Sequence, residues 1–250
     1  MGRRVRYHFL TVLVLAVSAA GCATRAPAPA GGSATPAPPS APATGPPGTA
    51  TVRPGVGSPS PPGFVGEVSA VTAADVAQSW RPGCPVGPDQ LTRLRLGYWG
   101  FDGQPHIGTM VVHRSVASDV ITVFGTLYRE RFPIRRLQPV DSYAGSDDRS
   151  MDADNTSGFN CRRAVSSGPA KWSAHAYGQA IDVNPVENPY LIDGMVLPPA
   201  GATYADRSRY RPGMAVPDGT LVDAFAAVGW RWGGAWRSSP DYQHFSKTGG

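Results

Sequence analysis

A low-complexity stretch near the N-terminus sets the first limit on what this chain can fold into. From Ala23 to about Pro62 the sequence consists of Ala, Pro, Gly, Ser and Thr with almost no large apolar side chains. Such a segment cannot bury enough surface to offset the entropy of ordering it, and its prolines keep it extended. We therefore expect residues 22–62 to form a disordered tether and residues 63–250 to form one folded domain.

The segment before the tether has the pattern of an export signal. Three arginines within the first six residues precede an apolar run, Phe9 to Val17, which is too short to predict a membrane span. The run ends in small residues directly before Cys22, which resembles a bacterial lipoprotein signal. We expect residues 1–21 to be this signal, with lipid attached to Cys22 and the protein on the outer face of the cell membrane. An ordinary signal peptide with an incidental cysteine is the alternative.

The basic charge of the chain lies outside the predicted domain. The sequence has 23 Lys and Arg against 18 Asp and Glu, and five of the arginines lie in the signal and tether, which contain no acid. Removing these five leaves 18 residues of each sign in the domain. Nucleic-acid binding usually requires a basic surface, so we expect no nucleic-acid partner. The five arginines are Arg3, Arg4, Arg6, Arg25 and Arg53.

Two cysteines remain in the predicted domain. Cys84 and Cys161 form an even set, and in an exported protein such a set favours a disulfide. Two buried, unpaired cysteines are the alternative.

Two segments have the spacing of amphipathic helices. The first has Ser118 as a predicted N-cap and Pro133 beyond its end, and the second opens at Thr220 and closes at Gly229. Their apolar positions are Val120, Val123, Phe124, Leu127 and Tyr128 in the first, and Leu221, Val222, Phe225 and Val228 in the second.

Two short segments have the pattern of strands. They are Thr109–His113 and Gln179–Val183, and long Pro- and Gly-rich loops separate them from the helices. This mixture predicts an α+β domain with a small antiparallel sheet and helices packed around it.

Four residues in the C-terminal part of the chain have the chemistry of a metal site. His175 and Asp182 lie in one segment, and Asp241 and His244 in another. Two histidines and a carboxylate are a common ligand set for catalytic zinc, with a fourth position open for water. Asp241 precedes His244 by three residues, which is close enough to take a proton from such a water.

These residues carry a family resemblance. The pattern Ser-x-His-x-x-Gly-x-Ala-x-Asp ends at Asp182, and Asp-x-x-His ends at His244. Together they resemble the zinc D,D-carboxypeptidase and L,D-endopeptidase family of peptidoglycan peptidases, which includes the vancomycin-resistance D,D-peptidases and bacteriophage endolysins. The resemblance implies the fold that this family shares with the Hedgehog signalling domain. It also implies Zn²⁺ bound by His175, Asp182 and His244, with Asp241 as the general base. Many family members have Glu in place of Asp241, so the branch of the family stays open.

The resemblance also implies a group that contacts the substrate carbonyl or carboxylate. Members of the family use an arginine upstream of the first motif, and Arg162 is our candidate, with Arg149 second; a surface arginine beside a disulfide is the alternative. We also expect Ser173, Tyr177 and Trp236 to contact substrate. Other aromatic residues line a groove or belong to the core, and two histidines outside the motifs are expected to be structural. These are Trp172, Trp230 and Trp232, and His106 and His113.

The predicted function is zinc-dependent hydrolysis of peptide bonds in peptidoglycan stem peptides or crosslinks by a monomer. The alternative is a non-catalytic cell-wall-binding module that retains a structural zinc. Structural zinc sites are usually closed by four protein ligands, so three ligands with Asp241 beside them favour catalysis. The residues leave open which peptide bond is cleaved.

Overall fold

The computed structural model of the protein describes residues 63–165 and 169–249. The predicted signal peptide (1–21), the lipidation site Cys22 and the tether (22–62) lie outside the described residues, so these three predictions stay predictions.

The largest sheet lies in the N-terminal half of the domain. Its strands β1 (Gly66–Ala70), β2 (Leu91–Trp99) and β3 (Pro105–His113) are antiparallel and adjacent in chain order. The predicted strand at 109–113 is confirmed and begins four residues earlier, because β3 pairs with β2 along its whole length, up to Trp99 opposite Pro105.

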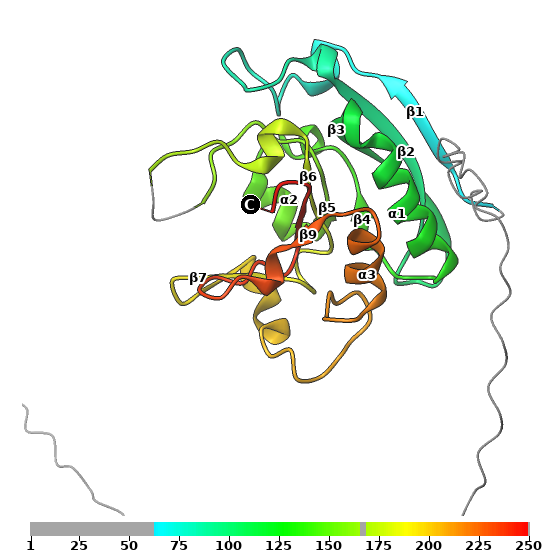
Figure 1. Cartoon of the computed structure of the whole chain (residues 1–250), viewed down its shortest axis with the longest axis vertical. Coiled ribbons are helices and arrows are strands. Elements are labelled where there is room, and N and C mark those ends of the chain that lie inside the picture. The colour runs from blue at the N-terminus through cyan, green and yellow to red at the C-terminus, as the bar shows by residue number, and fades with distance from the viewer. Residues whose placement is uncertain (1–62, 166–168, 250) are drawn as a thin grey trace, which may run out of the picture. The chain divides into compact units, whose positions relative to one another are not determined.

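Helix α1 (Ala117–Arg129) covers one face of this sheet and lies along β2 (Figure 1). Its predicted apolar stripe is buried, since Val120, Val123, Phe124 and Leu127 are at most 1% exposed and form the centre of the core. The spacing of the stripe identified the helix correctly, because burial of one face against a sheet is what that spacing encodes.

The predicted N-cap of α1 is wrong. The helix begins at Ala117, so Ser118 lies inside its first turn. A 3-10 turn (Arg114–Val116) leads directly into α1, and the His113 ring accepts a hydrogen bond from the backbone N–H of Ser115. The His113 ring thus caps the 3-10 turn, while the N-cap of α1 itself is Val116, which makes no side-chain capping hydrogen bond.

Helix α3 (Thr220–Ala226) also agrees with its predicted position. Gly219 is its N-cap, and the chain turns away at Gly229, which has a φ of 77°. The backbone N–H of Trp230 closes this end on the carbonyl of Phe225. Gly229 therefore allows the left-handed turn that commonly ends a helix.

A second antiparallel sheet lies in the C-terminal half. Strand β10 (His244–Ser246) runs between β6 (Ala180–Asp182) and β9 (Arg231–Trp232). Its central residue Phe245 is fully buried and stacks on Phe225 of α3 with ring centroids 4.2 Å apart. This contact joins the sheet to the main core.

The remaining elements are short. They are the helix α2 (Asp147–Asp152), the parallel pair β4 (Arg136–Leu137) and β5 (Asn155–Thr156), the hairpin β7 (Tyr190–Ile192) and β8 (Met195–Leu197), and 3-10 turns at Ala73–Val76, Pro88–Gln90, Val140–Tyr143, Ala174–Tyr177, Pro199–Tyr204 and Gly233–Ala235. The predicted α+β class is therefore confirmed, with two three-stranded antiparallel sheets where we expected one.

Cys84 and Cys161 are joined in the predicted disulfide, across 77 positions of sequence. They lie in a second, smaller apolar cluster that contains Val111, Phe159 and Trp172. The bridge thus connects the loop before β2 to the chain segment that follows β5.

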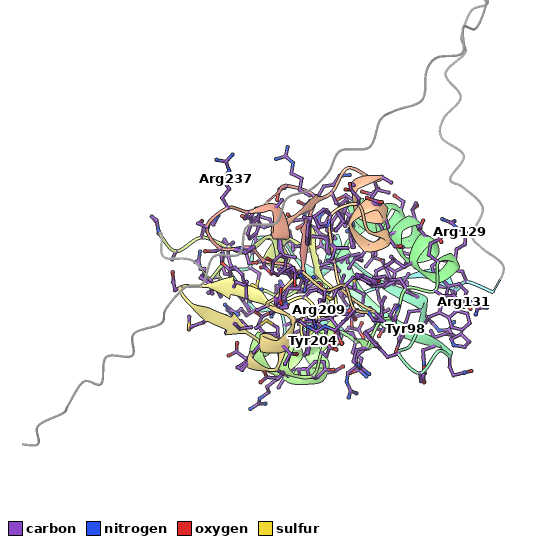
Figure 2. All side chains as sticks on the ribbon, turned by 90° about the horizontal axis from the view of Figure 1, so that it is seen from below. Tyr98, Arg129, Arg131, Tyr204, Arg209 and Arg237 are labelled. Carbon is purple, nitrogen blue, oxygen red and sulfur yellow. A yellow bond between two sulfur atoms is a disulfide. The ribbon has the colours of Figure 1, made fainter. Side chains whose placement is uncertain are left out.

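Arginine side chains project from several parts of the domain surface (Figure 2). Arg129 and Arg131 project from the end of α1, whereas Arg209 and Arg237 project from other parts of the domain. Among the described residues, no helix is both long enough and apolar enough to cross a membrane.

Candidate metal centre

The β6–β10 pair brings together two residues that are 62 positions apart in the chain. Asp182, the last residue of β6, lies directly opposite His244, the first residue of β10. Because residues paired across antiparallel strands point to the same face, their side chains meet. The register of this sheet therefore brings together two of the three predicted ligands, Asp182 and His244.

His175 reaches the same point from the 3-10 turn Ala174–Tyr177. Gly178 ends this turn with a φ of 64°, and a Cβ atom there would lie 2.5 Å from the backbone nitrogen of His113. Only glycine fits this close approach without displacing β3. The predicted sharp turn at Gly178 is thus present, and it directs the chain from His175 into β6.

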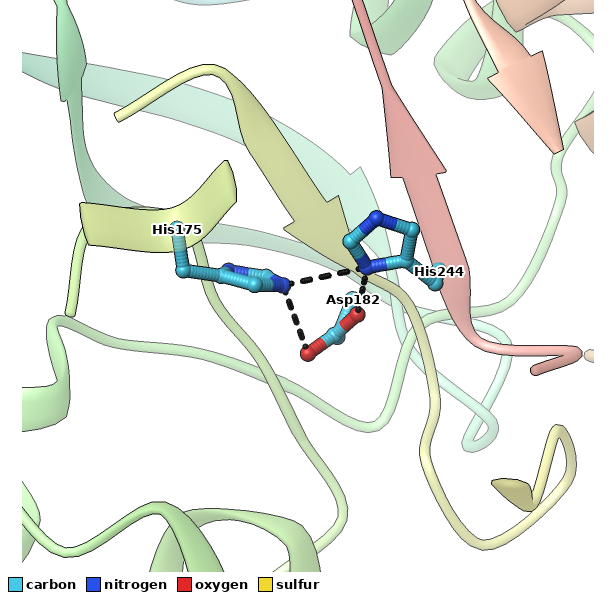
Figure 3. Close-up of side chains that lie close together, drawn as sticks. All are labelled: His175, Asp182 and His244. Atoms are coloured by element: carbon cyan, nitrogen blue, oxygen red, sulfur yellow. Dashed lines mark hydrogen bonds and ion pairs between the residues drawn. The ribbon is translucent and has the colours of Figure 1, made fainter. Parts of the chain in front are cut away.

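The three side chains present their ligand atoms to one another (Figure 3). Nε2 of His175 lies 3.1 Å from one carboxylate oxygen of Asp182, and Nδ1 of His244 lies 3.2 Å from the other. The two ring nitrogens are 3.2 Å apart. All three residues are buried, and their ligand atoms lie within 4.8 Å of one another.

Hydrogen bonding leaves these atoms facing a common centre. Nδ1 of His175 lies 2.7 Å from the carbonyl oxygen of Gly158, so it carries the proton that it donates there. In a neutral ring Nε2 of His175 then has a lone pair that points at Asp182 and His244. Nδ1 of His244 faces the same point, so a divalent cation there would have two imidazole nitrogens and a carboxylate around it.

The two histidines also affect the pKa of Asp182. Burial opposes its ionisation, but the charges and hydrogen bonds of His175 and His244 outweigh burial and hold the pKa of Asp182 well below its usual range. A metal ion at this position would take over the role of the ring protons, as metal ligands release protons on binding. Two imidazoles and one carboxylate are a donor set that suits Zn²⁺.

The group is open rather than closed. No fourth His, Cys, Asp or Glu joins it within residues 63–165 and 169–249. A cavity of about 210 Å³ lies beside it, and the cavity lining includes Asp182 and His244. Three protein ligands, two of which line a cavity, would leave a coordination position for water or substrate.

Asp241 also lines this cavity. Its Oδ1 atom is buried and has no hydrogen-bond partner in the described part of the chain. Burial raises the pKa of the Asp241 carboxyl to about 7, and the charges of Asp182 and Asp147 add to the rise. His244 and Arg162 act in the opposite direction. A carboxyl with a pKa near neutrality can both accept and return a proton.

Arg162 extends into the cavity from the other side. Its guanidinium lies 2.8 Å from Asp147 and 3.9 Å from Asp182, and the side chain is 23% exposed. Burial lowers the pKa of Arg162, but Asp147 and Asp182 outweigh it and raise the pKa overall. Arg162 is therefore a fixed positive charge beside the three candidate ligands.

Of the other four predicted substrate contacts, two line the cavity and two do not. Ser173 and Trp236 line the cavity, and the Trp236 ring lies against His244 at 5.4 Å between centroids. Arg149 is exposed on α2 and does not line the cavity, and Tyr177 is 40% exposed and does not line it either. A role in substrate binding for Arg149 and Tyr177 stays a prediction.

The remaining aromatic residues divide between cavity and core. Trp172 lines the cavity, whereas Trp230 packs on Phe225 and Trp232 stacks on Phe245. Two histidines lie elsewhere: His106 pairs with Asp102 at the surface, and His113 caps the turn before α1.

Sequence reasoning missed several residues of the cavity, of which three bear on its chemistry. Tyr190 and Gln243 contribute to its lining, and Asp147 pairs with Arg162. Gln243 lies within the second motif, between Asp241 and His244, so its position was a usable signal. Tyr190 and Asp147 lie in no motif, and only the fold brings them here.

Fold and site together define an α+β domain with an open candidate metal centre in a cavity. Residues 167–247 match a family model described as D-alanyl-D-alanine carboxypeptidase. The match includes His175, Asp182, Asp241 and His244, and it begins after Arg162. It supports a relationship between this segment and a family of peptidases. No curated protein and no solved structure matches the chain.

Proposed function

We propose that the protein is a zinc peptidase that hydrolyses peptide bonds in peptidoglycan stem peptides or crosslinks, as a D,D-carboxypeptidase or an endopeptidase. The observation that carries the proposal is the convergence of His175, Asp182 and His244 beside a cavity that Asp182 and His244 line together with Asp241. The match of residues 167–247 to a carboxypeptidase family supports the substrate class.

His175, Asp182 and His244 would hold the zinc. When bound, the metal activates a water molecule and polarises the scissile carbonyl. Asp241 is the general base: its carboxylate accepts a proton from the attacking water and then returns it to the leaving amine. The pKa of about 7 lets Asp241 exist in both protonation states near neutral pH.

Arg162 provides the second positive group. Amide hydrolysis builds negative charge on the carbonyl oxygen, and a fixed guanidinium in a partly dry cavity stabilises that charge. The planar fork of arginine pairs with oxygen in a way that the point charge of lysine does not. Arg162 lines the cavity and Arg149 does not, which favours Arg162 in this role.

Two finer assignments, one from the family resemblance and one from the N-terminal pattern, belong with this proposal. We propose that the domain has the fold shared by these D,D-peptidases and the Hedgehog signalling domain. We also propose that residues 1–21 direct export and that lipid on Cys22 anchors the protein to the membrane, with 22–62 as the tether to the wall. Exchange of Cys22 for Ser should release the protein from the membrane fraction or block its maturation.

The proposal is tested by digesting purified muropeptides with the zinc-loaded protein and identifying the products by mass spectrometry. Loss of one D-alanine would indicate a carboxypeptidase, and a divided stem or crosslink would indicate an endopeptidase. Asp241→Asn serves as the inactive control. Intact muropeptides after digestion with protein that retains about one zinc would reject the peptidase and favour the wall-binding alternative.

A further inference from the structure

We propose that Asp147 is a positioning residue that holds the Arg162 guanidinium beside the candidate metal centre. The catalytic consequence of this inference rests on the proposed peptidase function, but the positioning itself does not. Asp147 is the first residue of α2, lies outside both motifs and precedes the segment that matches the peptidase family.

Two ion pairs fix the position of the Arg162 guanidinium. One edge of its guanidinium carries Nε and Nη2. Nε lies 2.8 Å from Oδ1 of Asp147, and Nη2 lies 3.9 Å from Oδ2 of Asp182. The guanidinium therefore lies between a carboxylate outside the ligand set and a carboxylate within it, and the closer of the two is Asp147.

Asp147 is itself held in place. Its Oδ1 atom accepts a hydrogen bond from the side-chain amide of Asn160 at 3.3 Å, and Ser146 caps the helix that carries it. The Asp147 side chain is 21% exposed, so solvent screens this ion pair less than it would at the surface. A fixed, partly buried carboxylate is a suitable anchor for one end of an arginine.

The anchor matters because of the other anions in the cavity. After Asp147, the carboxylates whose charges act on Arg162 are those of Asp182 and Asp241. Asp182 is a candidate metal ligand and Asp241 the candidate base, so an arginine that paired with either would compete with its role. Asp147 keeps the positive charge available while preventing this competition.

The backbone of Arg162 is fixed by other contacts. The N–H of Cys161 donates to the carbonyl of Ser79, Arg81 donates to the carbonyl of Cys161, and Cys161 is joined to Cys84. Loss of Asp147 should therefore release the Arg162 side chain and leave its backbone in place.

The first test needs neither metal nor substrate. The order parameter of the Arg162 ¹⁵Nε–H bond is measured by NMR relaxation on the metal-free full chain, with the signal assigned by its loss in Arg162→Lys. We expect a rigid side chain in the wild type and a clearly lower order parameter in Asp147→Asn. Asp152→Asn, which removes an exposed acid from the other end of α2, should leave it unchanged. An unchanged value in Asp147→Asn would overturn the proposal.

The second test is a double-mutant cycle on hydrolysis by the zinc-loaded full chain. Asp147→Asn should lower kcat by about 10–100-fold, as loss of an outer-shell partner commonly does, with little change in KM. In an Arg162→Ala background the same exchange should change kcat by no more than about twofold, because the arginine that it positions is absent. Asp147→Glu, which keeps the charge, should retain more activity than Asp147→Asn.

The outcomes separate the two proposals. Equal losses of kcat in both backgrounds would show that Asp147 acts independently of Arg162, and a kcat unaffected by Asp147→Asn would remove its role in the reaction. Zinc content and melting temperature, measured for every variant, identify any loss that comes from unfolding. A wild type that fails to hydrolyse muropeptides would reject the proposed function, while the NMR measurement would still decide the positioning.

Discussion

The two halves of the described domain differ in the share of polar residues among those that they bury. Residues 63–165 contain the long strands β2 and β3 and the helix α1, whose buried side chains are mostly apolar. Residues 169–249 contain strands of two or three residues, and polar side chains, among them the candidate ligands, make up a larger share of their buried residues. The first half therefore supplies most of the apolar core, and the second half supplies the candidate ligands.

The site nevertheless draws on both halves. The segment that matches the peptidase family begins at residue 167, after the first half ends. Three groups beside the candidate ligands nevertheless come from the first half: the carbonyl of Gly158, the guanidinium of Arg162 and the carboxylate of Asp147. The motif residues thus supply the candidate ligands, while groups that contact them come from a region with no recognisable motif.

The largest effect is expected from loss of a ligand in the second half. His175→Ala should abolish zinc binding and lower hydrolysis to background, because only two ligands would remain. Metal content and muropeptide hydrolysis are measured together. The matched control is His106→Ala in the first half, which removes an exposed histidine and should retain both properties. Full activity of His175→Ala would show that the site lies elsewhere.

The next largest effect is expected at Asp241. Asp241→Asn should lower kcat by about 10²–10⁴-fold, the usual contribution of a general acid–base group, and should leave the zinc content unchanged. Asp193→Asn, an exchange in the turn of the β7–β8 hairpin, is the control and should leave kcat unchanged. If Asp241→Asn instead lost its metal, Asp241 would be a ligand.

The disulfide tests how far the second half depends on the first. Removal of the Cys84–Cys161 bridge by a double exchange to Ala should lower the free energy of unfolding by about 4 kcal/mol, the chain-entropy expectation for a loop of this length. Denaturant unfolding measures the loss. It should also lower kcat, because Cys161 holds the backbone beside Arg162. Unchanged stability would show that the bridge constrains little.

The last effect concerns pH and leaves hydrolysis aside. Burial raises the pKa of Glu187 from 4.5 to about 8, and the neighbouring Asp154 adds to the rise. The folded state then binds more protons than the unfolded state between these values, so the free energy of unfolding should fall as pH rises from about 5 to 8. Glu187→Gln should flatten this slope in denaturant unfolding measured across the range. An equal slope in the variant would assign it to other groups.

The sequence predicted those features that local pattern encodes. The apolar stripe of α1 and the glycine at the end of α3 identified both helices, and the spacing around His175 and His244 identified residues that the structure brings together. The number of sheets was not predictable, because strands such as β9 are only two residues long and have no periodicity to detect.

The features that tertiary contacts decide could not be predicted. Ser118 is a residue type that favours the N-cap position. The 3-10 turn Arg114–Val116 nevertheless leads directly into α1, which therefore begins at Ala117. Tyr177 lies beside a candidate ligand in sequence but at the surface in space, whereas Tyr190 is distant in sequence and lines the cavity. Neighbourhood in the chain is a poor guide to a site that is assembled from loops.

We propose that His175, Asp182 and His244 hold a zinc ion with one coordination position left open for chemistry. X-ray absorption at the zinc edge of the loaded full chain identifies the ligand atoms and their distances. We expect two imidazole nitrogens at about 2.0–2.1 Å, a carboxylate oxygen and at least one further oxygen from solvent. Sulfur in the first shell, or a shell closed by four protein ligands, would contradict it.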